Sequence, residues 1–408
     1  MATKQLRVPL LPVTEMEQGA FCRSEDDLVA KPLIEEMKAN VNWQKIPSHY
    51  TNLTAEELDQ SIKTSRDLLG QKVVLLGHHY QREEVIKYAD LQGDSYKLSV
   101  YASDQKTAEH IVFLGVHFMA ETADILSSDH QKVILPNMSA GCSMADMAST
   151  EDVLDCWSDL TAVVGPDIVT PITYMNSTAD IKALCGRNNG AVCTSSNALS
   201  VMKWAFQQRS KVLFLPDQHL GMNTALALGI PNNEIVVWNP YKPYGGLSDE
   251  ELKRAKVILW RGHCAVHTRF RPQQIHAARS NYPGVKIIVH PECPQEVVCE
   301  ADFNGSTEKI ISTVSNSEPG STWGIGTEIN LVHRLQSNNP DKKIFCLDPV
   351  VCPCSTMYRI HPAYVAWVLD ELKSDNPINI ISVPTDTKIQ AREALERMLQ
   401  ITNSVVRD

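Results

Sequence analysis

The sequence lacks three features that would assign it quickly to a class of protein. No apolar run approaches the roughly 20 residues that a membrane-spanning helix needs. Positive charge is not in excess, because the formal net charge is -10, and this argues against broad binding to nucleic acid or anionic membranes. The first apolar patch contains two prolines and is followed by acidic residues, so it is a poor signal peptide. We therefore predict a cytoplasmic protein with no nucleic-acid or membrane partner.

A CxxC pair is also missing, although the chain has 11 cysteines. The closest two are Cys352 and Cys354, so the sequence contains no local zinc knuckle. In a reducing compartment disulfides are rare, and reactive or metal-binding cysteines are favoured. Any metal site must therefore be assembled from distant segments of the chain.

What the sequence does contain is an alternation of short apolar runs with helical stretches. Unalternated, β-rich runs of this kind are typical of parallel sheets covered by helices on both faces. Residues 54–70 predict a helix, with Thr54 and Glu57 as a capping box and Gly70 at its end. A last helix near 387–401 places Ala391, Leu395 and Met398 on one face. The predicted strands lie within 72–80, 110–116, 132–137, 161–166, 190–196, 211–216, 234–240, 256–263, 285–292 and 343–349.

The chain also contains an internal repeat. His78 and Tyr80 end one predicted strand as His290 and Glu292 end another, and the interval from His78 to Ser95 equals that from His290 to Thr307. The next intervals are equal as well, because Cys142 follows Ser95 at the same distance in sequence as Cys354 follows Thr307. A looser third copy contains Tyr174, Asn176, Ser195 and Cys264, and its longer last interval indicates an insertion.

Three such units predict three pseudo-threefold-related, three-layer α-β-α domains with parallel sheets around a central site. The expected division is an arm at 1–50, a first domain at 51–145 completed by C-terminal helices at 361–408, a second at 146–266 and a third at 267–360. Equivalent strand ends would meet on the axis, where open α/β sheets bind ligands. Cys142, Cys264 and Cys354 would then supply three thiolates and leave one metal coordination position open. The alternative for each is a buried, small apolar residue.

The sequence resembles the quinolinate synthase family, which consists of iron–sulfur enzymes of NAD biosynthesis. The resemblance runs from about residue 60 to the end, on the segments GHHYQ, ADLQGDS, GCSMADMA, TYMNS, CTSSNA, HPEC, NGSTEKI and CSTMYRI. It implies three α/β domains around a [4Fe–4S] cluster held by three cysteines. It also implies a transferase that condenses iminoaspartate with dihydroxyacetone phosphate to quinolinate, phosphate and water. In this family the cluster acts as a Lewis acid through the iron that lacks a cysteine ligand, and it is not an electron carrier.

The resemblance suggests roles for the residues at the strand ends. Glu292 is the predicted general acid/base and His290 a substrate ligand, although a solvated carboxylate is the commoner fate of a glutamate. His78 and Tyr80 are predicted to move protons or hold substrate oxygens, whereas His79 is better explained as structural. His267 is a further candidate for substrate contact.

Other polar residues are predicted to hold the anionic groups of the substrates. Tyr174 and Asn176 should donate to a carboxylate or phosphate. Ser95, Ser195 and Thr307 each open a predicted helix, where free N–H groups and the helix dipole favour anions. Simple N-capping is the alternative for these three.

Two departures from the family pattern and two other functions stay open. The long segment before the first motif has no assigned function, and either Cys352 or Cys354 could be the third ligand. We choose Cys354, because the family's methionine, here Met357, follows it at the expected spacing and the repeated interval ends there. Cys193, Cys293 and Cys299 are expected to be packing residues.

The other functions are a three-cysteine zinc hydrolase or lyase and a non-enzymatic iron–sulfur sensor. For the enzyme, we also expect domain motion and coupling to an aspartate oxidase or dehydrogenase, because the imine substrate hydrolyses in water.

Overall fold

The computed structural model describes residues 12–22 and 31–405. The predictions for residues 1–11, and part of the predicted arm, lie outside these residues. No helix in the described part of the chain is long and apolar enough to cross a membrane.

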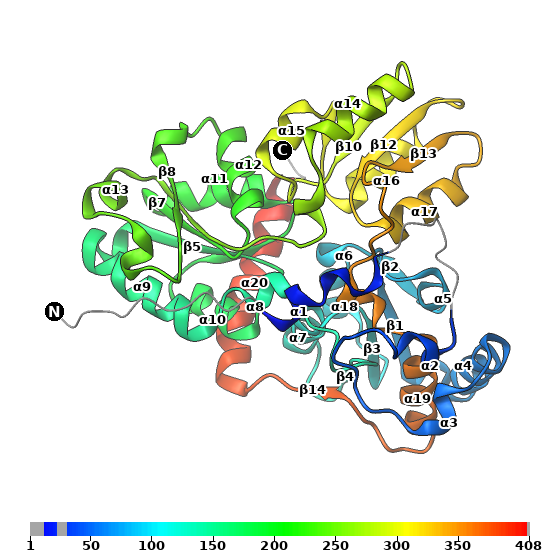
Figure 1. Ribbon diagram of the computed structural model, residues 1–408. Coiled ribbons are helices and arrows are strands. Elements are labelled where there is room, and N and C mark those ends of the chain that lie inside the picture. Colours follow the sequence, from blue (N-terminus) through cyan, green and yellow to red (C-terminus); the bar gives the residue numbers. More distant parts are fainter. Residues whose placement is uncertain (1–11, 23–30, 406–408) are drawn as a thin grey trace.

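Three largely parallel sheets with flanking helices form the body of the molecule (Figure 1). The first has the order β14-β4-β3-β1-β2, the second β6-β5-β7-β9-β8 and the third β11-β10-β12-β13. The order 2-1-3-4 thus recurs in each, with β8 as an additional edge strand in the second and β14, which is antiparallel to β4, in the first. This confirms the predicted α/β class, and β8 lies inside the interval in which an insertion was predicted.

The strands are short, and nine of the ten predicted apolar runs contain one, while five further strands, β2, β5, β11, β12 and β14, lie outside the predicted runs. Their bounds are β1 Val73–His78, β2 Leu91–Gly93, β3 His110–Leu114, β4 Lys132–Ile134, β5 Val169–Tyr174, β6 Ala191–Cys193, β7 Lys211–Leu215, β8 Ile235–Trp238, β9 Val257–Trp260, β10 Lys286–Val289, β11 Phe303–Asn304, β12 Thr322–Gly326, β13 Lys343–Cys346 and β14 Ile380–Ile381. The prediction of a strand at 161–166 is wrong. Those residues end helix α9 (Thr150–Val164), which Ser149 caps and Gly165 terminates with a φ of 94°.

Helices connect the strands and cover the sheets. The α-helices are α1 Val13–Met16, α2 Leu33–Glu36, α3 Ser48–Thr51, α4 Ala55–Leu69, α5 Glu83–Ile86, α6 Ser95–Asp104, α7 His117–Leu126, α8 Ser143–Asp146, α9 Thr150–Val164, α10 Ala179–Arg187, α11 Ala198–Gln208, α12 Gln218–Ala227, α13 Asp249–Arg254, α14 Pro272–Asn281, α15 Gln295–Glu300, α16 Thr307–Ser315, α17 Ile329–Asn338, α18 Ser355–Tyr358, α19 Pro362–Lys373 and α20 Thr385–Val405. The 3₁₀ helices are η1 Gln18–Phe21, η2 Gly70–Lys72, η3 Pro166–Ile168, η4 Asn232–Glu234, η5 Pro243–Gly246 and η6 His267–Arg269.

The helix predicted at 54–70 begins and ends where expected. Thr54 and Glu57 form the capping box of α4, and Gly70 follows its last residue with a φ of 52°. In the C-terminal segment, Ala391, Leu395 and Met398 are fully buried on one face of α20, as predicted.

The C-terminal segment packs on two units. Helix α19 packs against α4, and β14 joins the first sheet. Helix α20 packs mainly against α10 and β6 of the second unit and also contacts α7 of the first. It therefore links the first two units, as its position in Figure 1 shows.

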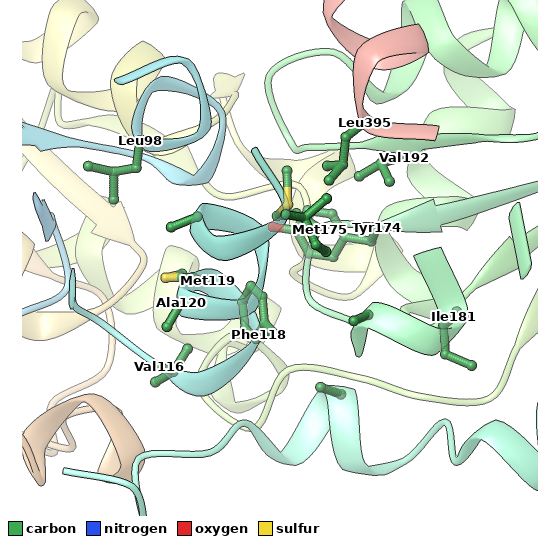
Figure 2. Packing of buried hydrophobic residues seen from close by; sticks show 14 of the residues in the cluster. Leu98, Val116, Phe118, Met119, Ala120, Tyr174, Met175, Ile181, Val192 and Leu395 are labelled. Atoms are coloured by element: carbon green, nitrogen blue, oxygen red, sulfur yellow. The ribbon is translucent and has the colours of Figure 1, made fainter. Parts of the chain in front are cut away.

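The hydrophobic core is continuous across the first two units but separate in the third. In Figure 2, Phe118 of α7 lies on the side of that helix nearer to Tyr174 and Met175 at the end of β5, and Leu395 of α20 lies by Val192. The third sheet has one cluster on each face, because successive residues of β10 point to opposite sides. Polar contacts between the third unit and the other two include those of His79 with Glu308 and of Asn223 with the carbonyl oxygens of Pro291 and Cys293.

Candidate active site at the junction of three sheets

One central cavity is lined by residues from all three units. Every predicted site residue except His267 lines it, and His267 lies directly behind Glu292. The lining residues are His78, Tyr80, Ser95, Cys142, Tyr174, Asn176, Ser195, Cys264, His290, Glu292, Thr307 and Cys354. His79 is not among them. Its Nε2 lies 2.8 Å from Glu308 Oε1, which links the first and third units.

The three cysteines occupy equivalent places beyond the last paired strand of each unit. Cys142 and Cys354 immediately precede α8 and α18, and Cys264 lies just before η6. Backbone N–H groups of these short helices point at the sulfurs. Burial raises the pKa of all three thiols, so the metal-free protein holds them protonated and metal binding would release protons.

The spacing of the three sulfurs distinguishes between kinds of metal group. A single tetrahedral zinc holds its sulfur ligands at about 2.3 Å, so two such sulfurs lie about 3.8 Å apart. Among the described residues, the group with three candidate ligand atoms within 4.8 Å of one another is Cys264, His267 and Glu292, not the three cysteines. The wider cysteine arrangement fits a polynuclear iron–sulfur cluster better than one zinc ion.

Glu292 lies in a compact cluster of histidines and tyrosines. Its Oε2 is 2.6 Å from His267 Nδ1 and 3.9 Å from His290 Nδ1, and the two imidazole rings stack with centroids 4.4 Å apart. Burial alone would raise the pKa of this carboxyl. Interactions with His267 and His290, and hydrogen bonds from His267 and Tyr174, outweigh burial and hold the pKa of Glu292 below its usual range. Glu292 is therefore a buried carboxylate at neutral pH.

Four side chains near Glu292, those of His78, His290, Tyr80 and Tyr174, are neutral at pH 7. Burial lowers the pKa of His78 and of His290 to about 3. Burial and the charge of Glu292 raise the pKa values of Tyr80 and Tyr174 well above the usual value of a tyrosine. These four side chains can therefore donate hydrogen bonds to an anionic ligand without carrying charge.

The repeat is visible in the local geometry of the strand ends. The amide of Tyr80 donates to His78 Nδ1 at 3.1 Å, and the amide of Glu292 donates to His290 Nδ1 at 3.4 Å. The same turn thus presents a phenol in the first unit and a carboxylate in the third.

The predicted anion-binding residues are placed differently in the three units. Ser95 and Thr307 are the first residues of α6 and α16, while Asp94 and Ser306 cap these helices, so the hydroxyls of Ser95 and Thr307 are not used for capping. Ser195 does not open a helix, contrary to the prediction. It lies in a turn closed by Asn197 Oδ1, which accepts from the amide of Thr194 at 2.7 Å, and α11 begins only after that turn. Asn176 Oδ1 is buried and has no hydrogen-bond partner among the described residues, as expected of a group that contacts a ligand.

Comparison with known proteins agrees with this geometry. The family model described as "Quinolinate synthetase A protein" matches residues 60–400. The chain belongs to this family. It is 56% identical to the quinolinate synthase of Corynebacterium glutamicum over 358 residues, which cover 88% of this chain and 91% of that protein. It is 54% identical to that of Herpetosiphon aurantiacus, with 87% and 95% covered. The resemblance predicted from the motifs is confirmed.

The surroundings of the two neighbouring cysteines, Cys352 and Cys354, differ. Cys354 lines the central cavity, whereas Cys352 forms a disulfide with Cys22. Disulfides were expected to be rare, but the described part of the chain contains the disulfide between Cys22 and Cys352. Cys193 and Cys293 are buried, as expected of packing residues, but the prediction for Cys299 is wrong, because this residue is exposed on short helix α15.

Sequence reasoning missed three buried polar residues of this site. Asp217 follows β7 and caps α12, and burial together with the charge of Glu292 raises its pKa. Thr327 follows β12, and its hydroxyl lies 2.8 Å from Tyr80 Oη and 3.1 Å from His267 Nε2. Glu328 accepts a hydrogen bond from the amide of Cys354 at 3.2 Å. A polar residue directly after an apolar run was the available signal for Asp217 and Thr327.

Proposed function

We propose that the protein is a quinolinate synthase that condenses iminoaspartate with dihydroxyacetone phosphate and releases phosphate and water. The carrying observation is the convergence of residues from three units on one cavity in a chain of this family. In this proposal Cys142, Cys264 and Cys354 hold a [4Fe–4S] cluster. When bound, the cluster supplies a Lewis acid through the iron that lacks a cysteine.

The roles of the protein's own residues follow from their ionisation states. Glu292 accepts and returns protons, because it is the ionised carboxylate beside the cysteines. Tyr174 and Tyr80 orient substrate oxygens as neutral phenols, and His78 and His290 do so as neutral imidazoles.

No lysine or arginine lines the described cavity. The phosphate and carboxylates are therefore held by neutral donors and by the N-termini of α6 and α16, with Ser95, Thr307, Ser195 and Asn176 supplying side-chain contacts. His267 supports Glu292 from behind, so in this proposal it positions the base.

The wider organisation belongs to the same proposal. We keep the division at 51–145, 146–266 and 267–360. Of the C-terminal segment 361–408, which was predicted to complete the first domain, we assign α19 and β14 to that domain, whereas α20 packs mainly on the second. The third sheet has its own hydrophobic clusters on both faces, which supports a rotation of the third domain that admits substrates. Equal exposure of the site in structures with and without product would refute this motion. We also propose a cytoplasmic location and supply of the imine by an aspartate-oxidising enzyme.

The two other functions are less well supported. Wide cysteine spacing disfavours a zinc hydrolase, and a sensor has no need for the buried Glu292–His267 pair. The deciding experiment measures iron, acid-labile sulfide and zinc after anaerobic purification, followed by quinolinate formation from the two substrates. About four irons and four sulfides per chain, with turnover, are expected. One zinc without sulfide would refute the proposal, and a cluster without turnover would favour the sensor.

A further inference from the structure

The segment 12–22 lies before the family-model match at 60–400 and has no role in the function described above. It forms α1 and η1, and Figure 1 shows α1 beside α8, close to the centre of the molecule. Its side chains contact all three cysteine loops, each of which belongs to a different unit.

The first two contacts reach the loops of Cys142 and Cys264. Thr14 Oγ1 donates to Asp146 Oδ2 at 2.6 Å, and Asp146 is in α8, the helix that begins directly after Cys142. Glu15 Oε1 lies 3.2 Å from Nε2 of His263, the residue before Cys264.

The third contact is with the residues on either side of Cys354. Gln18 Nε2 donates to the carbonyl oxygen of Pro353 at 3.1 Å, and Gln18 Oε1 accepts from Ser355 Oγ at 3.2 Å. The Cys22–Cys352 disulfide then ties the end of the same segment to this loop.

We propose that Thr14, Glu15, Gln18 and Cys22 form a clamp that positions the three cysteine loops relative to one another. The proposal rests on the proposed function, because it gives the clamp a three-cysteine metal group to retain. A group held by three loops is lost when one loop moves away, and hydrogen bonds to a common segment oppose that movement. These four are positioning residues and do not contact substrate.

The test measures how fast the iron–sulfur holoenzyme loses iron to an excess of chelator under anaerobic conditions. The main variant is Thr14→Val/Gln18→Met, which keeps side-chain volume and removes hydrogen bonds to two loops. Met16→Ala is the matched control, because Met16 is in the same helix and is 65% exposed. Thr14→Ser is the conservative variant that keeps the hydroxyl. Thermal unfolding of the metal-free proteins reports general stability.

The double variant should release iron at least about tenfold faster than the wild type, because the one hydrogen bond of Thr14 and the two of Gln18 described above are lost. Met16→Ala and Thr14→Ser should match the wild type, and the metal-free unfolding temperatures should agree. Glu15→Met, which removes the oxygen that contacts His263, and Cys22→Ser probe the other two contacts and should also speed release, so the test does not depend on one variant folding.

Equal release rates in the wild type and all clamp variants would overturn the inference while leaving the proposed function intact. A parallel fall in the metal-free unfolding temperature would also overturn it, because the segment would then be only a structural support. A wild-type protein without iron and sulfide would refute the cluster itself, and the clamp with it.

Discussion

Two neighbouring buried carboxyls, Glu292 and Asp217, are predicted to respond oppositely to amide substitution. Glu292 is ionised, so Glu292→Gln replaces a proton acceptor with a group that cannot take a proton. The pKa of Asp217 is raised by burial and by the charge of Glu292, so this carboxyl is predicted to be protonated at neutral pH. Asp217→Asn therefore exchanges one neutral group for another of nearly the same shape.

The magnitudes follow from these states. General acid–base catalysis contributes about 10²–10⁴-fold, so Glu292→Gln should lower kcat by that factor, or about 3–5 kcal/mol in activation free energy. Asp217 Oδ1 accepts from the amides of His219 and Leu220 at 2.7 and 3.0 Å, and an asparagine oxygen keeps both bonds. Asp217 Oδ2 has no hydrogen-bond partner among the described residues. Asp217→Asn should therefore change kcat by less than about fivefold.

The assay is anaerobic quinolinate formation at saturating substrates, normalised to iron content. Both variants should hold as much iron as the wild type, because neither residue is a proposed cluster ligand. If Glu292→Gln kept more than about a tenth of the wild-type rate with full iron, Glu292 would not be the acid/base. If Asp217→Asn were as damaging as Glu292→Gln, the assigned protonation state of Asp217 would be wrong.

Three further predictions address the ligands, the packing and the pH dependence. Cys354→Ser should abolish iron binding while Cys352→Ser retains it, because only Cys354 of these two lines the cavity; iron analysis showing the reverse would move the ligand. A Cβ at Gly186 would lie 1.8 Å from the backbone oxygen of Gln390, so Gly186→Ala should force α10 and α20 apart. The overpacking cost of about 3 kcal/mol exceeds the helix-propensity gain of about 1 kcal/mol, and an unchanged denaturant midpoint would contradict this packing. Burial raises the pKa of Glu328 to about 7, with hydrogen bonds offsetting part of the effect. The folded state then holds a proton that the unfolded state loses, so metal-free stability should fall by about 3 kcal/mol between about pH 4.5 and 7. Glu328→Gln should remove this slope, and calorimetry finding the same slope in the variant would assign it to another group.

The apolar runs were enough to predict most of the sheets, but not the segments where local chemistry conflicts with the fold. β5 contains Pro171 yet pairs with strands on both sides, and a proline in a run argues against an interior strand. The run at 161–166 has strand-like residues but continues the helix that Ser149 caps at its start. In both cases packing against neighbouring elements outweighs local preference.

The sequence by itself determined the three-unit plan and the set of residues that meet at the centre. It could do so because strand and helix lengths set the spacing between a strand end, a helix start and a cysteine. Equal intervals then place these at equivalent points of the first and third units, and the second is a looser copy with an insertion. Tertiary structure alone decided the ionisation of Glu292 and Asp217, the pairing of Cys352 with Cys22 and the contacts of Thr14, Glu15 and Gln18. Each of these depends on burial or on contacts between segments far apart in the chain, and no local pattern of residues encodes that proximity.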